Sequence, residues 1–176
     1  DALGARPIPG KPCKGGTNLK SKKIKNMSQS LSCVLLHIIF STKDKYPFIQ
    51  PDIETDLFSY TAAIARKQGC PAIIINGMPD HIHVFCNLSR TITIAQLVEE
   101  VKTSTSKWIK SKSPDYQKFQ WQSGYGVFSV SPSKRLAVKG YIENQKEHHR
   151  VKSFREEFRE FLKEYGVLFD ERYVWD

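Results

Sequence analysis

The order in which strand-like and helix-like segments follow one another places the tightest limit on the fold of this chain. Residues 33–42 are apolar on both sides, which predicts a central strand. A helical apolar repeat covers 51–68, a hairpin of two short strands covers 71–87, and a second helix opens at Thr93. Residues 120–130 alternate as a further strand, with close backbone approach expected at its glycines. This series of strand, helix, strand, strand, helix, strand is typical of a ferredoxin-like α+β sandwich.

Two more helices are expected after this pattern. The Ser-Pro-Ser segment 131–133 is expected to cap a helix over 134–149, and Ser153 with Glu156 forms a capping box for a helix that ends at residue 165. The expected fold class is therefore α+β and ferredoxin-like, with C-terminal helices added.

The N-terminal segment differs in composition from the rest of the chain. Residues 1–26 are rich in Gly, Pro and Lys and lack apolar periodicity, which predicts a flexible basic extension. They hold seven of the 27 basic residues, so the net charge falls from +9 for the whole chain to +3 for residues 27–176. Met27 resembles a natural start. The extension is interpreted as an upstream or vector-derived leader, with a basic arm that touches nucleic acid as the alternative, and residues 27–176 are expected to form one domain.

The sequence lacks two common signals. No apolar run approaches the length of a membrane span and the N-terminus has no secretory pattern, which predicts a cytoplasmic protein without a membrane partner. Cys13, Cys33, Cys70 and Cys86 show no CxxC pairing, so we expect reduced thiols rather than a disulfide framework.

Two histidines mark a candidate metal site. His81 and His83 follow the predicted turn 77–80, and alternation along a strand places both on one face, opposite Ile82. Two adjacent imidazoles suit two nitrogen ligands of one metal ion. Cys86 falls on the other face, which speaks against a zinc site shared with the two histidines.

Other residues could join this pair. His37 lies in the predicted central strand and is interpreted as a hydrogen-bonded core histidine, although a neighbouring strand could bring it near the pair. On the helix 134–149, Tyr141, Gln145 and His148 recur at three- and four-residue steps and so share one face. A tyrosine on a helix usually packs against the core. Because the chain also has the histidine pair, a catalytic role for Tyr141 is the alternative.

Together these residues resemble a known family. The segments 80–84 (DHIHV) and 141–145 (YIENQ) are similar to those of the single-tyrosine HUH endonucleases, specifically the small transposases of the insertion-sequence 200/605 type. The segments 37–43 (HIIFSTK) and 124–126 (GYG) also resemble that family, so the likeness covers residues 27–175. The order and spacing of the motifs together are specific.

The resemblance implies a chemistry. It implies a DNA transposase that cleaves and rejoins single-stranded DNA at hairpin-flanked element ends through a 5′-phosphotyrosine. Tyr141 matches the nucleophile, and His81, His83 and Gln145 match the ligands of Mg²⁺ or Mn²⁺. Because tyrosine has an ordinary pKa of about 10, the metal or a neighbouring cation must activate it. Tyr125 is a rival nucleophile, although its place beside two glycines on a strand favours packing or DNA contact.

A positive surface is expected to contact the DNA. Lysines on the exposed side of the helix that opens at Thr93, with basic residues at the start of the helix 134–149, would follow the phosphate backbone or simply form solvated faces. They are Lys102, Lys107, Lys110, Lys112, Lys134, Arg135 and Lys139. The resemblance further implies a homodimer whose tyrosine-bearing helices are exchanged between protomers, with residues 131–133 as a possible hinge.

Three alternatives remain open. One is a domesticated relative that binds structured DNA repeats without transposing. Another is a ferredoxin-like module for single-stranded RNA, whose sheet should carry exposed aromatic residues where this chain has histidines. The third is a cupin-type metal hydrolase, against which the long amphipathic helices speak.

Overall fold

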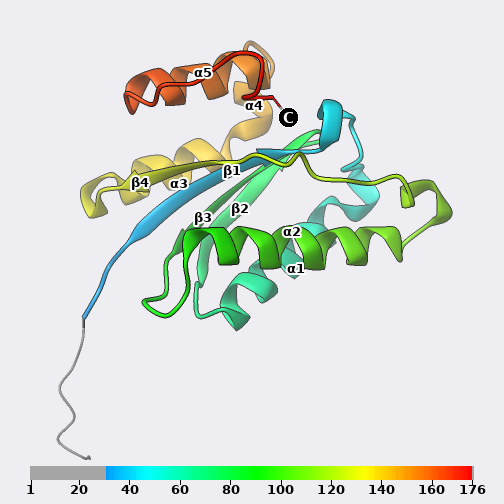
Figure 1. The fold of residues 1–176 in the computed structure, drawn as a ribbon, viewed down its shortest axis with the longest axis horizontal. Helices are drawn as coiled ribbons and strands as arrows, with labels where there is room; N and C mark the ends of the chain where they lie inside the picture. The colour runs from blue at the N-terminus through cyan, green and yellow to red at the C-terminus, as the bar shows by residue number, and fades with distance from the viewer. Residues whose placement is uncertain (1–30, 176) are drawn as a thin grey trace, which may run out of the picture. The chain divides into compact units, whose positions relative to one another are not determined.

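The computed structural model describes residues 31–175. The predicted extension 1–26 therefore lies outside the described residues. The sheet has four antiparallel strands in the order β2-β3-β1-β4. Figure 1 shows how these strands lie between the helices. The strands are β1 (Leu35–Ser41), β2 (Ala72–Met78), β3 (His81–Asn87) and β4 (Gly126–Val130).

Helices cover both faces of this sheet (Figure 1). One face carries α1 (Pro51–Lys67) and α2 (Ile94–Lys110), and the other carries α3 (Arg135–Glu143), α4 (Gln145–His148) and α5 (Phe154–Glu164). The described residues also form three short 3-10 helices: η1 (Lys43–Lys45), η2 (Pro114–Tyr116) and η3 (Pro132–Lys134). None of the helices within residues 31–175 has the length and hydropathy of a membrane span. The predicted ferredoxin-like α+β fold with additional C-terminal helices is confirmed.

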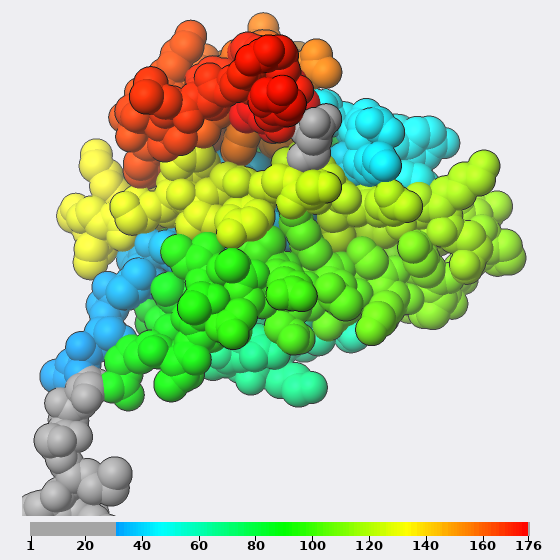
Figure 2. Space-filling view, in the orientation of Figure 1, coloured from blue at the N-terminus to red at the C-terminus, as the bar shows by residue number. Residues whose placement is uncertain are grey.

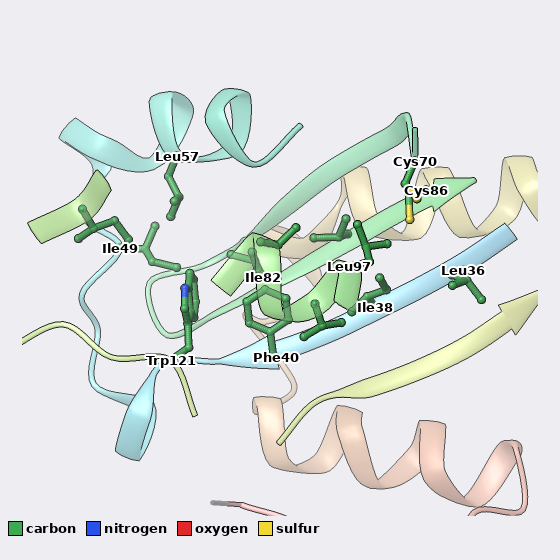
Figure 3. Packing of buried hydrophobic residues seen from close by; sticks show 14 of the residues in the cluster. Leu36, Ile38, Phe40, Ile49, Leu57, Cys70, Ile82, Cys86, Leu97 and Trp121 are labelled. Atoms are coloured by element: carbon green, nitrogen blue, oxygen red, sulfur yellow. The ribbon is translucent and has the colours of Figure 1, made fainter. Parts of the chain in front are cut away.

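The two central strands have two apolar faces. On one face, Ile38 of β1 and Ile82 of β3 pack against Leu97 of α2 in the largest buried cluster (Figure 3). On the other face, Ile39 packs beneath α5 and Phe85 packs against α3. Burying an aliphatic side chain of this size contributes about 1.5–3 kcal/mol, so register is strongly specified. The same alternation places both histidines of β3 on one face, opposite Ile82, as predicted. That face is the one covered by α3 and α5.

Both predicted capping boxes are present. The Thr93 hydroxyl accepts a hydrogen bond from the Gln96 backbone N–H, and the Gln96 side chain accepts one from the Thr93 backbone. Ser153 and Glu156 make the same reciprocal pair at the start of α5. Each helix therefore begins where its sequence motif places it.

The hairpin turn is shorter than predicted. Gly77 and Met78 belong to β2 and pair with Ile82 and His81, which leaves only residues 79–80 in the turn. A Cβ at residue 77 would lie 2.2 Å from the carbonyl oxygen of His81. Glycine is therefore required for the close pairing of the two strands rather than for the turn itself.

The prediction of a strand over residues 120–130 was wrong for its first half. Pairing as β4 begins only at Gly126, and Trp121 forms an isolated bridge to Thr42. The Lys102 ammonium lies 2.9, 3.2 and 2.7 Å from the carbonyl oxygens of residues 122, 123 and 124. Because these carbonyls converge on one cation, they cannot alternate in a strand ladder.

The helix predicted over residues 134–149 is broken. It begins at Arg135, ends at Glu143, and resumes as the short α4 after Asn144, whose φ and ψ are −97° and 20°. The Asn76 side chain donates to the carbonyls of residues 142 and 143, at 2.8 and 3.1 Å. Those carbonyls lie in the last turn of α3, so a residue of β2 fixes its end. Ser131 makes no side-chain cap and bonds the Ser133 hydroxyl instead.

The cysteines of the described residues are free thiols. Cys70 and Cys86 are buried, whereas Cys33 is exposed. Cys86 belongs to the cluster beneath α1 and α2, on the face away from the histidines, as predicted (Figure 3).

Candidate metal and tyrosine site

The site lies between β3 and the C-terminal helices. His81 and His83 are 1% and 0% exposed, and their ring centroids are 5.1 Å apart. Phe154 of α5 stacks on His81 at 4.4 Å between ring centroids. In Figure 2 the atoms of α5 and the following segment, orange to red, form a continuous layer along the top of the view. The two imidazoles therefore lie in a buried layer beneath α5.

Each imidazole is held through its Nδ1 atom. His81 Nδ1 lies 2.7 Å from Asp80 Oδ1, and His149 Nδ1 lies 2.8 Å from the Lys152 carbonyl oxygen. Both partners accept, so these Nδ1 atoms carry the proton and leave the Nε2 lone pairs free in the neutral rings.

His83 is held in the same way by a second histidine. Its Nδ1 lies 2.9 Å from Nε2 of His37, a buried residue of β1. The prediction that His37 is a hydrogen-bonded core histidine is confirmed, and the structure places it directly behind the pair. Such partners orient an imidazole towards whatever its Nε2 atom binds.

Glu157 of α5 faces these imidazoles. Its Oε2 atom lies 3.8 Å from His81 Nε2 and 3.6 Å from His83 Nε2. The same oxygen lies 3.2 Å from His149 Nε2. One ligand atom from each of these four residues lies within 4.8 Å of all the others. The group therefore has the residue types and the spacing of a metal site.

Tyr141 and Gln145 meet the same carboxylate. The Tyr141 hydroxyl donates to Glu157 Oε1, and Gln145 Nε2 donates to that oxygen at 3.0 Å. The Tyr141 and His83 ring centroids are 6.2 Å apart. The structure thus brings the predicted nucleophile and the three predicted metal ligands together within one protomer.

Burial sets the protonation of the group. Burial, followed by the nearby His81, lowers the pKa of His83 well below its usual value. The same two causes lower the pKa of His149 to about 4. Burial raises the pKa of Glu157 to about 7, against the opposing influence of His81. In each case the loss of water disfavours the charged form. His83 and His149 therefore offer neutral imidazoles, and Glu157 offers a carboxylate that a bound cation would keep ionised.

The side chains fit a divalent cation. In residues 31–175, five buried polar side-chain atoms lack a hydrogen-bond partner, and all five belong to this site: Nε2 of His81, His83 and His149, Oε1 of Gln145 and Oε2 of Glu157. A buried polar atom left unsatisfied costs about 1–3 kcal/mol. A cation would satisfy several such electron-pair donors at once, whereas no donor among the described residues does so.

Comparison with known proteins shows the family. A family model described as "Transposase IS200 like" matches residues 30–145. The chain belongs to the IS200-like transposase family. Among curated proteins, ISDra2 transposase TnpA of Deinococcus radiodurans is 23% identical over 114 residues, which cover 62% of this chain and 81% of the relative.

Solved structures share the fold of this IS200-like transposase. A crystal structure of a proposed transposase from Deinococcus radiodurans R1 gives a TM-score of 0.54 at 24% identity, over 69% of this chain and 98% of that chain. A REP-associated tyrosine transposase bound to a REP hairpin gives 0.52 at 13% identity, over 70% and 74% of the two chains. At these identities the structures support the fold class.

Sequence reasoning missed two members of the cluster in this transposase. His149 and Glu157 follow residue 145, where the family match ends. A signal for Glu157 was present, because it lies within an apolar helical stripe that includes Phe154, Phe158 and Leu162, and all four are buried. An acid on the apolar face of a helix needs a buried partner. His149 carried no such signal, since only the end of α4 brings it to the site.

The predicted DNA-contacting residues are divided between the two faces of the sheet. Lys107 and Lys110 of α2 line a groove of about 600 Å³ with Trp121 and Tyr125. Because α2 covers the opposite face, the sheet separates this groove from the histidines. Lys112 follows α2, with its ammonium 4.2 Å from the centroid of the Trp108 ring. None of the four aromatic and basic groove residues therefore lies beside Glu157.

The remaining basic residues lie on or beside α3. Lys134 and Arg135 are exposed at its start, and the Lys139 ammonium lies 3.9 Å from Glu143. This set is on the same side of the sheet as Tyr141. Lys102 is different, because its ammonium is bound to the carbonyls of residues 122–124 and burial lowers its pKa to about 8.

Proposed function

We propose that this transposase cleaves and rejoins single-stranded DNA with Tyr141 as the nucleophile. The observation that carries the proposal is the convergence of the Tyr141 phenol, the Gln145 amide and the paired imidazoles on one carboxylate. Tyr125 lines the groove beside α2 instead, which favours a DNA-contacting role for it. A phenol beside metal-binding side chains suits attack on a phosphodiester.

A divalent cation is part of the proposal. His81, His83 and Gln145 would hold Mg²⁺ or Mn²⁺ through their orphaned Nε2 and Oε1 atoms. Bound there, the ion would stabilise the negative charge that builds on the phosphate in the transition state. The Asp80 carboxylate and the His37 ring keep the two imidazoles oriented for that task.

The bonds and protons balance in this exchange. The Tyr141 oxygen forms a bond to phosphorus while the bond from phosphorus to the 3′ oxygen breaks, and the departing 3′ oxygen takes up a proton from solvent, which leaves a 5′-phosphotyrosine and a 3′-hydroxyl. Glu157 Oε1 accepts the Tyr141 hydroxyl hydrogen bond in the described arrangement, so Tyr141 loses its proton to solvent only after α5 has moved. Attack by a 3′-hydroxyl on the phosphotyrosine reverses the exchange, so rejoining requires no external energy source.

Substrate access requires movement of α5. His83, Gln145 and Glu157 are 0%, 0% and 2% exposed, so a phosphate cannot reach them while α5 covers the sheet. Separation of α5 would withdraw Glu157 and leave the histidines of β3 open on the sheet. We infer that the described arrangement precedes DNA binding.

The proposed partner is single-stranded DNA that carries a hairpin. A structural neighbour is described as bound to a REP hairpin, which supports a partner of this kind. Contact with flanking phosphates would come from Lys107, Lys110 and Lys112 on one face of the sheet, and from Lys134, Arg135 and Lys139 on the other, and binding should weaken with salt. Lys102 would support the groove by holding the loop carbonyls of residues 122–124.

A homodimer with exchanged helices remains part of the proposal. Segment 131–133 joins β4 to α3, and a change in its path would carry Tyr141 to a partner subunit. Within one protomer, Tyr141 already lies beside its own histidines. Exchange is therefore proposed for the DNA-bound state, after α5 has moved.

A cleavage assay tests the nucleophile. Labelled single-stranded hairpin DNA incubated with Mn²⁺ or Mg²⁺ should yield a protein-DNA adduct that survives denaturing electrophoresis. Tyr141→Phe and His81→Ala should abolish it, whereas Tyr125→Phe should retain it. An adduct that persists in Tyr141→Phe would contradict the assignment. Hairpin binding without an adduct under either ion would favour a binding protein over a nuclease.

A further inference from the structure

His149 and Glu157 come from the C-terminal segment, yet they face the histidine pair of β3. Both residues lie beyond the segment that matches the transposase family. Glu157 is 2% exposed, and the side chain of His149 is 5% exposed. Glu157 Oε2 and His149 Nε2 both lack hydrogen-bond partners among the described residues. Glu157 of α5 and His149, which follows α4, therefore each direct a buried ligand atom without a hydrogen-bond partner into the site.

We propose that, in the described arrangement, His81, His83, His149 and Glu157 form a four-ligand site for a nitrogen-preferring divalent ion such as Zn²⁺, which ties α5 to β3. This site differs from the set of His81, His83 and Gln145 that would serve catalysis. The inference deepens the proposed function, since the two sites share the histidine pair, but ion binding here requires no DNA.

Two of the three distances from Glu157 Oε2 to the imidazoles are longer than a hydrogen bond, and the third, 3.2 Å to His149 Nε2, lies at its upper limit. Hydrogen bonds between N–H and O atoms span about 2.7–3.2 Å. Glu157 Oε2 lies 3.6 Å from His83 Nε2 and 3.8 Å from His81 Nε2, which is too long for such bonds. Ligand atoms held about 2.0–2.2 Å from one tetrahedral zinc ion lie roughly 3.4 Å from each other. The three carboxylate-imidazole distances, 3.2, 3.6 and 3.8 Å, lie around that separation.

The donor atoms favour zinc-type ions over magnesium. Three imidazole nitrogens and one carboxylate oxygen make up the group. Imidazole suits Zn²⁺, Co²⁺ and related ions, whereas Mg²⁺ prefers an octahedral shell of oxygen atoms and retains several waters. A site this deeply buried has little room for such waters. We therefore expect tight binding of Zn²⁺ or Co²⁺ and weak binding of Mg²⁺.

Gln145 supports the carboxylate in this arrangement. Its Nε2 atom donates to Glu157 Oε1, the oxygen that also accepts from Tyr141. Oε1 is therefore occupied by two donors, and Oε2 is left to face the imidazoles. An ion that instead used Gln145 as its third ligand would expel Glu157. Loss of the Glu157 carboxylate would therefore weaken ion binding in the four-ligand site, but would not weaken it in a site made of His81, His83 and Gln145.

Ion titration of the full chain without DNA distinguishes the ligand set that includes Glu157 from the ligand set that includes Gln145. After treatment with EDTA and dialysis, Co²⁺ is added while its d-d absorption is followed, and Zn²⁺ is then used as a competitor. Glu157→Gln and His149→Asn should each weaken Co²⁺ binding at least about tenfold. Glu164→Gln, which alters an exposed acid on the same helix, should leave it unchanged. Co²⁺ affinity and absorption that are unchanged in Glu157→Gln would overturn the proposal.

Two further measurements guard against misfolding and against confusion with cleavage. The unfolding midpoint of each variant in EDTA shows whether it folds. Hydrogen exchange of the α5 amides should slow on addition of Zn²⁺ in the wild type and in Glu164→Gln, but not in Glu157→Gln or His149→Asn. Faster exchange with Zn²⁺ would mean that the ion expels Glu157, and would contradict the site. Glu157-dependent ion binding without any DNA adduct would refute only the nuclease, whereas an adduct with Glu157-independent ion binding would refute only this site.

Discussion

Gly126 controls how closely α5 approaches the sheet, and Gly126→Ala tests this contact. A Cβ at residue 126 would lie 2.5 Å from Cε2 and 2.8 Å from Cζ of Phe158. Real Cβ atoms essentially never approach other heavy atoms this closely. The Phe158 ring is 5% exposed and packs near Phe154 and Trp175, at centroid distances of 5.7 and 6.0 Å. It therefore cannot swing aside without moving α5.

The expected cost follows from this overlap. Inserting an extra carbon atom into a packed core typically costs about 1–3 kcal/mol. For a domain of this size, each kcal/mol lowers the melting temperature by about 2–4 °C. We expect Gly126→Ala to lose about 2 kcal/mol, equivalent to a fall of about 4–8 °C. Because Phe158 adjoins Glu157 in the sequence, the same shift should loosen the carboxylate from the histidines.

Thermal and urea unfolding measure the loss, and hydrogen exchange locates it. The α5 amides should exchange faster in Gly126→Ala, while those of α1 and α2 should change little. Gly140→Ala is the matched control, because a Cβ there meets nothing within 4 Å and the residue lies inside α3. In a helix interior, alanine is favoured over glycine by about 0.5–1 kcal/mol, so this variant should be stabilised.

Equal stability of Gly126→Ala and the wild type would refute the reasoning. That result would mean that α5 does not rest on β4 at this distance in solution. Destabilisation without faster α5 exchange would also count against it, because the strain would then lie within the sheet.

Three other changes test the supports of the site. His37→Phe should weaken binding of the divalent ion about 10–100-fold by removing the partner of His83 Nδ1, whereas His37→Gln, which keeps an acceptor, should retain most of it; calorimetric titration compares the two. Asn76→Ala removes two hydrogen bonds to the end of α3 and should cost about 1–3 kcal/mol in urea unfolding, and an unchanged midpoint would contradict that role. Burial lowers the pKa of Lys102 to about 8 from 10.5, so between these pH values the unfolded chain binds more protons and the contribution of Lys102 to stability should rise with pH. The stability difference between wild type and Lys102→Met should therefore depend on pH across this window, and that between wild type and Lys107→Met should not.

Features set by local sequence were predicted well. The capping boxes at Thr93 and Ser153 lie entirely within four residues, so no distant group is needed to place the helix starts. The apolar face of β1 and the alternation in β3 likewise follow from neighbouring residues. These short-range signals were enough to indicate the order of elements and hence the fold class.

Features that depend on residues far apart in the sequence were not predicted. The break at Asn144 coincides with hydrogen bonds from Asn76 to the preceding carbonyls, and the irregular path of residues 120–124 follows from the Lys102 ammonium. In both places one polar side chain, far away in the sequence, satisfies backbone groups that would otherwise extend a regular element. Alternation or helical spacing in the local sequence carries no record of such a partner.

By itself, the sequence determined that His81 and His83 share one side of a strand, and it predicted that Tyr141 and Gln145 share one side of a single helix, although the structure places them in α3 and α4, on either side of the break at Asn144. Both statements are consequences of backbone periods of 2.0 and 3.6 residues. Only the tertiary structure decided that Glu157 and His149 join them, because α5 must fold back over the sheet before its one buried acid can meet the imidazoles. Local periodicity orients side chains within an element, whereas their meeting across elements depends on the packing of the whole domain.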